Sequence, residues 1–330
     1  MVKNDAIIGE RKPMHLPGSS IDLPTITDQD DSDIQFGVKK QIDIIAVSFI
    51  RKAEEVEQVR NTVRAQGGRS KVYARIENHE GLSHFEEILH EADGIIIARG
   101  PLSMELSPEK VFIAQNWMIE KANQVAKPVI IQSHVLDSMV RMPKPTRGEA
   151  ADVCQTVING VDCVMLFNET AEGSFPINAV NALAKICVEG ERTLDHRRLY
   201  GDMKMYTPMP MITAESVAAS SVNTVLDLPI DLIVVLTETG RFARLVAKYR
   251  PPVPILALSS DKQVVKQLQT IRGVIGHKIG SFDEGSIIKM VNKITKDAHL
   301  CKTGQKVVFI QGEKEETADE TNIVKIIEIE

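Results

Sequence analysis

The stretch at residues 92–106, ADGIIIARGPLSMEL, ends a short apolar run with Arg99 and Gly100 and places Pro101 at its exit. In parallel α/β folds, the carboxyl ends of strands and the helix N-termini beside them supply backbone N–H groups that bind anionic substrates. Arg99 and Gly100 therefore indicate an anion-binding edge. Because proline has no N–H group, Pro101 removes one donor from this expected site.

Other residues that could do chemistry form weaker patterns. His79 and His84 are five residues apart, which sets them about 140° apart around a helix and disfavours a shared metal. The four cysteines are widely separated without a CxxC pair, so they indicate neither a disulfide framework nor a thiolate metal site. The sequence contains neither a Walker motif nor a recognisable Ser-His-Asp arrangement.

Ten short runs rich in β-branched and other apolar residues are expected to form the strands that position these residues. The first five lie at residues 42–49, 72–77, 94–98, 128–133 and 162–167. The second five lie at residues 231–237, 254–259, 273–279, 306–311 and 322–329. Helical patterns separate most of them, which predicts two α/β domains with mainly parallel sheets. The prolines between residues 200 and 215 predict a linker or a domain boundary.

One connecting helix is predicted in detail. Ser107 is placed to cap it, Pro108 suits its first position, and an apolar stripe follows at helical spacing. The stripe consists of Val111, Ala114, Met118, Ala122 and Val125, with Trp117 beside it as a predicted core residue. The charged run at 312–320 predicts a solvent-exposed turn.

Composition limits the classes of function. The chain has 39 lysines and arginines against 45 aspartates and glutamates, and 4% aromatic residues, which argues against a nucleic-acid-binding surface. No apolar run approaches the roughly 18 residues that span a bilayer, and the N-terminus lacks the apolar stretch of a secretory signal. We therefore expect a cytoplasmic protein that acts on small molecules and binds neither nucleic acid nor membrane.

Long sequence blocks carry a specific family resemblance. RIENHEGLSHFEEILHEADGIIIARG, LDSMVRMPKPTRGEAADVCQTVINGVDCVML, NETAEG and LVAKYRP closely resemble pyruvate kinase, and MYTPMPM with KICVEGERTLD looks most like its plant cytosolic branch. The resemblance implies an α/β fold: a partial TIM barrel (strands four to eight), then a C-terminal α/β domain with a mainly parallel sheet. The implied divisions are 1–40, a remnant of lid exit and barrel re-entry, 41–200, the partial barrel, and 201–330, the C-terminal domain.

The resemblance also implies a reaction and its ligands. Family members transfer a phosphoryl group from phosphoenolpyruvate to ADP in glycolysis, using Mg²⁺ and usually K⁺. Relative to the family pattern, this chain is expected to begin late, without three barrel strands and most of the lid, which would carry the K⁺ ligands and much of the nucleotide clamp. Five barrel strands leave two edges and an apolar surface, so we expect homo-oligomers or hetero-oligomers with pyruvate kinase subunits.

The family's catalytic positions are substituted in this sequence. Arg75 in RIEN stands where the family has the lysine that stabilises the transferring phosphoryl group. Glu77 corresponds to one Mg²⁺ ligand, whereas Pro101 replaces the aspartate that would be the second. Gly100 and Pro101 lie in the loop that receives the substrate carboxylate, and Ser133 replaces a threonine of the substrate site. Further substitutions in the same pocket are Ser103, His134, Phe167 and Asn168.

These substitutions leave more than one hypothesis open. An active pyruvate kinase would use Arg75 in place of the lysine and hold Mg²⁺ through Glu77 and water. Alternatively, the chain is an inactive or severely impaired relative that binds or regulates full-length subunits, and a gene fragment without a selected role is a third interpretation. Loss of one preorganised anion-binding donor typically costs about 10²–10³ in rate, and Pro101 removes a metal ligand as well, which favours inactivity.

Overall fold

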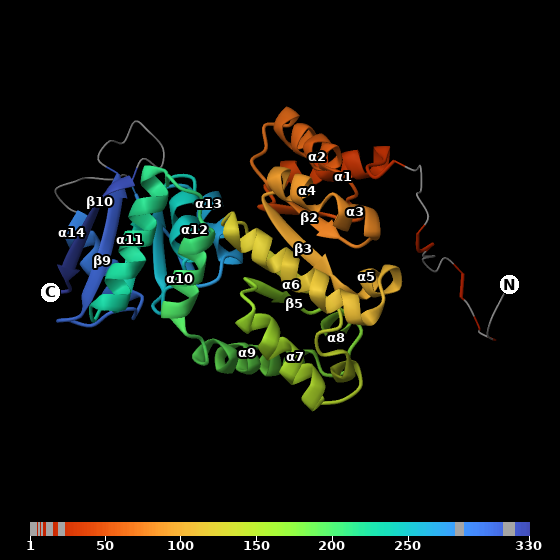
Figure 1. The fold of residues 1–330 in the computed structure, drawn as a ribbon. Helices are drawn as coiled ribbons and strands as arrows, with labels where there is room; N and C mark the ends of the chain where they lie inside the picture. The colour runs from red at the N-terminus through yellow and green to blue at the C-terminus, as the bar shows by residue number, and fades with distance from the viewer. Residues whose placement is uncertain are drawn as a thin grey trace.

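The structure is a computed structural model that describes residues 24–280, 287–312 and 321–330, together with residues 5, 7, 9, 10 and 16–18. Within them the chain forms two α/β units, each built on a five-stranded sheet (Figure 1). All ten strands expected from the sequence are present, which confirms the predicted fold class. In the charged run at 312–320, residues 313–320 lie outside the described residues, so the turn predicted there stays a prediction.

Sheet A is parallel and follows chain order, with β1 and β5 at its edges in the described part of the chain. Its strands are β1 (Ile44–Val47), β2 (Lys71–Ile76), β3 (Gly94–Ala98), β4 (Val129–Gln132) and β5 (Cys163–Met165). The helices of this unit are α1 (Asp28–Lys39), α2 (Ala53–Ala65), α3 (His79–Ser83), α4 (Phe85–Glu91), α5 (Arg99–Glu105), α6 (Pro108–Gln124), η1 (Asp137–Val140), α7 (Arg147–Ile158), α8 (Asn168–Ala171) and α9 (Pro176–Arg192).

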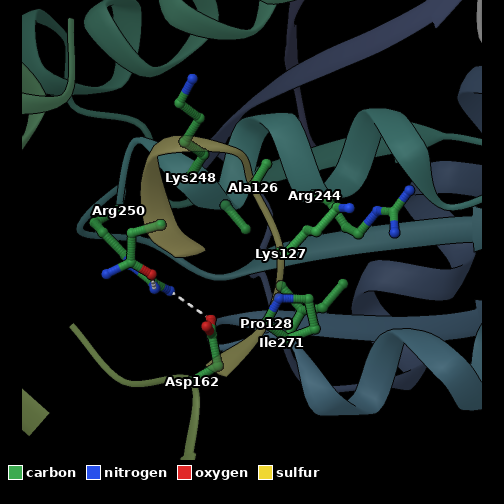
Figure 2. A pocket seen from close by; sticks show the side chains of 10 residues that line it. Ala126, Lys127, Pro128, Asp162, Arg244, Lys248, Arg250 and Ile271 are labelled. Carbon is green, nitrogen blue, oxygen red and sulfur yellow. Dashed lines mark hydrogen bonds and ion pairs between the residues drawn. The ribbon is translucent and has the colours of Figure 1, made fainter. Parts of the chain in front are cut away.

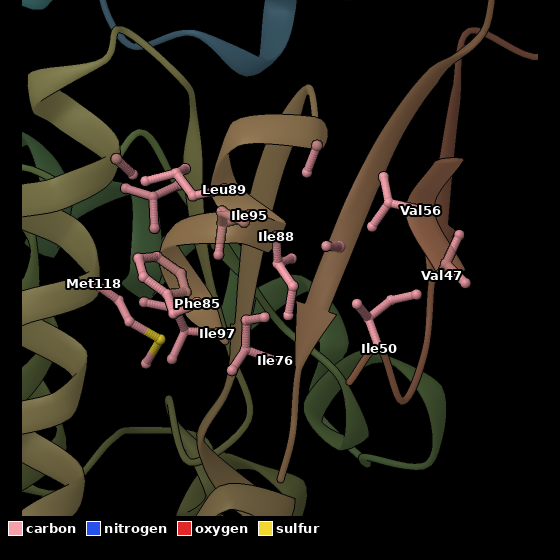
Figure 3. Close-up of a cluster of buried hydrophobic side chains, with 14 of the residues drawn as sticks. Val47, Ile50, Val56, Ile76, Phe85, Ile88, Leu89, Ile95, Ile97 and Met118 are labelled. Atoms are coloured by element: carbon pink, nitrogen blue, oxygen red, sulfur yellow. The ribbon is translucent and has the colours of Figure 1, made fainter. Parts of the chain in front are cut away.

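One face of sheet A packs against α2, α4 and α6. Strand β3 is buried along its whole length, which is why its sequence is a continuous apolar run rather than an alternating one. The core on this face includes Phe85, Ile97 and Met118, all fully buried (Figure 3). Trp117 of α6 packs on Phe85 with 5.1 Å between ring centroids, so its predicted core role is confirmed.

Helix α6 begins at Pro108 as predicted, but two details of that prediction are wrong. Ser107 occupies the N-cap position, yet its side chain makes no capping hydrogen bond. Val125 lies beyond the last helical residue and is exposed, because the chain turns at the left-handed residue Ala126, with φ of 54°. The buried stripe of the helix therefore ends at Ala122.

The opposite face of sheet A carries a smaller cluster that includes Tyr73, Ile96 and Ile130. All three side chains are almost fully buried. Part of their cover comes from the C-terminal unit, because the Tyr73 hydroxyl lies 2.6 Å from Thr270 Oγ1.

Sheet B has the order β10-β9-β6-β7-β8 and is parallel except for β10, which pairs antiparallel with β9. Its strands are β6 (Leu232–Leu236), β7 (Ile255–Ser259), β8 (Val274–Lys278), β9 (Lys306–Gly312) and β10 (Thr321–Glu328). The helices of this unit are α10 (His196–Tyr206), α11 (Thr213–Asp227), α12 (Arg241–Lys248), α13 (Lys262–Gln267), η2 (Leu268–Thr270) and α14 (Ile287–Asp297).

The stretch expected to be a linker is only partly one. Helix α10 runs through its first half, and Tyr200 of that helix packs in the core of the C-terminal unit against Tyr249, with 5.7 Å between ring centroids. The prolines therefore follow α10 and separate it from α11.

Arg250 joins the two units. Its guanidinium donates to Asp162 Oδ1 at 2.8 Å, to Asn123 Oδ1 at 2.8 Å and to the Gly160 carbonyl at 2.7 Å. Figure 2 shows the Arg250 and Asp162 side chains together beside a small cavity whose lining comes from both units. The C-terminal unit is thus attached to the segment that leads into β5.

Candidate active site

Parallel strands bring their carboxyl ends to one edge of a sheet, and the predicted site residues follow neighbouring strands. Arg75 lies near the end of β2 and Glu77 directly follows that strand, whereas Gly100 and Pro101 follow β3 and Ser133 follows β4. Strand β3 pairs with both β2 and β4. The five residues named from the sequence therefore lie at the same edge of sheet A.

Arg75 and Glu77 form an ion pair at this edge. Arg75 Nη1 lies 3.1 Å from Glu77 Oε1, and the two side chains are 21% and 8% exposed. The same Glu77 oxygen accepts the backbone N–H of Phe49 at 3.1 Å, and Arg75 Nη1 also donates to Ser48 Oγ at 3.0 Å. The carboxylate that the family resemblance assigned to Mg²⁺ is therefore neutralised by a guanidinium.

Pro101 is the third residue of the short helix α5. The first N–H groups of a helix have no carbonyl acceptor within it, so a proline in the first turn removes no helical hydrogen bond. This position explains how the fold accommodates Pro101. The side chain nevertheless supplies no carboxylate, and the backbone supplies no N–H donor, to the edge of the sheet.

Gly100 lies against Ser133 on the neighbouring strand end. A Cβ atom on Gly100 would be 3.3 Å from Ser133 Cβ and 3.6 Å from Ser133 Oγ. Ser133 and His134 both have positive φ, 67° and 51°, a conformation that non-glycine residues uncommonly adopt. Two successive left-handed residues turn the chain at the end of β4 and set the Ser133 side chain beside the β3 loop.

Arg99 organises this turn, a role that the sequence analysis did not assign to it. Its buried side chain donates from Nε to the Ser133 carbonyl at 3.1 Å and from Nη2 to the His134 carbonyl. Asp152 lies 2.6 Å from Nη1 and compensates the charge. An arginine directly after a buried apolar strand was the available signal, because a buried guanidinium requires several acceptors.

Glu169 is a second residue that the sequence analysis missed. Its carboxylate is almost completely buried and accepts the Leu136 N–H at 2.8 Å and the Phe167 N–H at 2.9 Å. It thereby ties the loop after β4 to the loop after β5. Phe167, substituted relative to the family pattern, leaves much of its side chain exposed at this end of the sheet.

Asp137 begins η1, directly after Leu136, whose N–H Glu169 accepts. Burial raises the pKa of Asp137; His134 opposes this shift, while the neighbouring carboxylates of Glu169 and Glu149 reinforce it. The Asp137 carboxyl group therefore retains its proton to a higher pH than a free aspartate.

The donor set at this edge does not fit Mg²⁺, which proteins usually hold through one or two carboxylates in octahedral geometry with water. Glu77 is engaged by Arg75, and Pro101, at the position for which the family resemblance implied a second carboxylate ligand, supplies none. Over the described ranges, no group of three or more His, Cys, Asp or Glu side chains is arranged to hold a metal ion. Arg75 instead places a positive charge beside the carboxylate that would bind the dication.

Comparison with known proteins defines the family. The family model of the pyruvate kinase barrel domain matches residues 1–180, and that of the pyruvate kinase alpha/beta domain matches residues 215–327. The chain belongs to the pyruvate kinase family. A pyruvate kinase of Eimeria tenella is 45% identical over 100% of this chain and 62% of its own length, and one of Dictyostelium discoideum is 41% identical over 99% and 66%.

Pyruvate kinases of other groups extend this comparison. A probable cytosolic isozyme of Arabidopsis thaliana is 40% identical over 93% of this chain and 66% of its own length, so the relatives include plant cytosolic isozymes without being confined to plants. The crystal structure of a pyruvate kinase from Cryptosporidium parvum superposes with a TM-score of 0.90 at 36% identity, covering 96% of this chain and 64% of that one. The chain spans 62% to 66% of the length of these relatives.

None of the helices in the described part of the chain combines the length and the apolar character needed to cross a bilayer.

Proposed function

We propose that this chain is a pyruvate kinase homologue that retains the anion-binding edge of sheet A but transfers a phosphoryl group from phosphoenolpyruvate to ADP very slowly or not at all. The observation that carries this proposal is the ion pair between Arg75 and Glu77, with Pro101 in the second carboxylate position. Phosphoryl transfer depends on positioning and on cations that neutralise the developing charge. A site that neutralises its own metal ligand lacks the main cation of the reaction.

The proposal assigns a role to each site residue. Arg75 faces the phosphoryl group, Glu77 holds Arg75, and Gly100 with Ser133 forms the part of the pocket that receives the substrate carboxylate. Phosphoenolpyruvate and ADP are the proposed ligands, by membership of the family. Mg²⁺ and K⁺ are family cofactors, and the proposal gives neither ion a complete set of ligands among the described residues. The names of the plant relatives support a cytosolic location.

A lactate-dehydrogenase-coupled assay tests the proposal. The purified chain is supplied with phosphoenolpyruvate, ADP, Mg²⁺ and K⁺, and its rate is compared with that of a Glu77→Ala variant prepared in the same way. We expect equal rates, because Glu77 does not serve a metal in the unmodified chain. A rate close to that of an active pyruvate kinase, and lost in Glu77→Ala, would overturn the proposal.

We further propose that the chain associates with subunits of its own kind or with other pyruvate kinase subunits. A stripe on one face of α9 supports this, because Ile177, Val180 and Val188 are 74%, 51% and 47% exposed at helical spacing. The opposite face of α9 is packed against the body of the protein. Charged substitutions on this stripe should release the partner.

A further inference from the structure

We infer that this site binds a small phosphorylated carboxylic acid without a divalent metal, with the Arg75 guanidinium as the cation that receives the anion. The inference rests on the proposed function for the class of ligand and goes beyond it in assigning how the negative charge is balanced. It follows from the misfit between the donor set and Mg²⁺.

The hydrogen bonds of Arg75 leave part of its guanidinium available. Contacts with Glu77 and Ser48 both involve Nη1. Within the described ranges, Nη2 has no hydrogen bond assigned, and Nε is buried without a partner. A guanidinium carries five N–H donors in a planar fork suited to phosphate and carboxylate oxygens. Arg75 therefore still has donors to offer at the carboxyl edge of β2.

The charges at this edge favour an anion over a dication. Glu77 and Arg75 compensate each other at 3.1 Å, so an added Mg²⁺ would meet a like charge beside its one carboxylate. Pro101 supplies no second carboxylate to offset that repulsion. An anion is instead attracted by the Arg75 guanidinium. It is repelled by a single carboxylate, that of Glu77, which already accepts two hydrogen bonds.

The neighbouring strand ends supply the remaining surface. Ser133 lies against Gly100, so its half-buried hydroxyl lies beside the loop that follows β3. Arg99 fixes the carbonyls of Ser133 and His134, which limits how far this turn can move away. The anion therefore meets one guanidinium and one hydroxyl on a preorganised edge, and no step of this binding requires a metal.

Isothermal titration of the full chain with phosphoenolpyruvate tests the inference, once with EDTA and once with Mg²⁺. We expect dissociation constants that agree within about twofold under the two conditions. Arg75→Met should weaken binding by about tenfold or more under both, because a hydrogen bond to a charged group is lost. A requirement for Mg²⁺, or an absence of binding under both conditions, overturns the inference.

The Glu77→Gln variant shows whether Arg75 or a metal ion balances the charge of phosphoenolpyruvate. The two possibilities predict opposite changes in the affinity for phosphoenolpyruvate. If Arg75 is the cation, removal of the competing carboxylate tightens phosphoenolpyruvate binding several-fold in EDTA. If Glu77 serves a metal, the same change weakens binding in Mg²⁺. Glutamine keeps an oxygen that accepts the Phe49 N–H, so the local fold is preserved.

A double variant provides the converse test. Arg75→Lys with Pro101→Asp introduces a second carboxylate and a compact ammonium, and phosphoenolpyruvate binding should become dependent on Mg²⁺. Arg198→Lys, on an exposed helix surface, is the matched control and should leave binding unchanged. Thermal melts of every variant confirm folding. Turnover by the unmodified chain at the rate of an active pyruvate kinase would overturn the proposed function, whereas the binding of phosphoenolpyruvate and its dependence on Mg²⁺ decide this inference.

Discussion

The Arg250 guanidinium lies 2.8 Å from the Asp162 carboxylate, and the two side chains are 11% and 4% exposed. Asp162 also accepts the Val129 N–H at 3.1 Å and the Arg272 N–H at 3.2 Å. One carboxylate therefore fixes the starts of β4 and β5 and binds the C-terminal unit to them. Removal of either charge leaves its partner buried and uncompensated.

Arg250→Met should lower the free energy of unfolding by about 3–5 kcal/mol, the usual cost of breaking a buried ion pair from one side. Because the pair joins the two units, we expect differential scanning calorimetry to resolve two transitions where the unmodified chain gives a more cooperative one. Arg192→Met is the matched control, since its pair with Glu189 is exposed and contributes about 0–1 kcal/mol. Equal losses in the two variants would refute the structural role of Arg250.

Arg99→Met should destabilise the turn after β4. The carbonyls of Ser133 and His134 lose charged donors worth about 1.5–3 kcal/mol each, so we expect faster amide hydrogen exchange in the loop at residues 133–136. Asp152→Asn should have a smaller effect, because Asp152 is considerably more exposed than Arg99. Unchanged exchange in Arg99→Met would show that the turn is held by other contacts.

Gly100→Ala should weaken phosphoenolpyruvate binding by forcing the β3 loop and Ser133 apart, since the new Cβ would lie 3.3 Å from Ser133 Cβ. Ser133→Gly removes that contact and relieves the positive φ at Ser133. The double variant Gly100→Ala with Ser133→Gly should therefore recover the thermal stability lost in Gly100→Ala. Calorimetric titration and thermal melts of the three variants measure both effects, and additive losses would contradict the predicted contact.

Asp93 predicts a specific dependence of stability on pH. Burial would raise the pKa of Asp93, but Lys71, the Val72 N–H and Arg60 outweigh burial, so the pKa lies below its usual value. A lowered carboxyl pKa stabilises the fold above the unfolded-state value of about 3.9, and this stabilisation is lost as the pH falls through the folded-state value. Urea unfolding should therefore show Asp93→Asn less stable than the unmodified chain at pH 7, with the difference shrinking below about pH 4.

The control for this pH series is Asp202→Asn, because Asp202 is exposed and forms only a long ion pair with Arg198. Its stability should follow that of the unmodified chain at every pH. A constant deficit of Asp93→Asn down to pH 2 would mean that the carboxylate charge is not what stabilises the loop before β3.

Val180→Asp with Ile177→Asp should reduce association through α9, because each substitution places a charge in an exposed apolar stripe. Analytical ultracentrifugation of the chain alone, and mixed with an active pyruvate kinase subunit, measures the effect. Lys185→Asp serves as the control for added negative charge on the same helix. A single monomeric species for the unmodified chain under both conditions would contradict the proposed association.

The strands could be predicted because each depends on a local run of apolar residues, as GIIIA for β3 shows. The location of Arg75, Gly100 and Ser133 at one edge of sheet A could be predicted, because the carboxyl ends of parallel strands lie at the same edge of a sheet. The ion pair between Arg75 and Glu77 was not predicted, although residues two apart on an extended chain lie on the same face. Sequence spacing places these residues near one another without fixing which atoms meet.

The hydrogen-bond acceptors of Arg99 and Arg250, which lie far away in the sequence, could not be predicted either. Arg99 donates to the carbonyls of Ser133 and His134, which are 34 and 35 residues away in the sequence. Arg250 donates to Asp162, which is 88 residues away. Each pairing depends on the packing of whole βα units. The prediction for Val125 failed for a local reason, since the left-handed turn at Ala126 ends the helix although helical spacing continues in the sequence.

The strand orders of the two sheets have a consequence for synthesis on the ribosome. In sheet A each strand pairs with the one made just before it, so the sheet can grow as the chain emerges. In sheet B, β6 ends at Leu236 and its neighbour β9 begins at Lys306. At roughly 5–20 residues per second, one edge of β6 waits about 4–14 s for its partner. During that interval the unpaired N–H and C=O groups on that side of β6 are available to strands of other chains, so pairing between nascent chains competes with folding of the C-terminal unit.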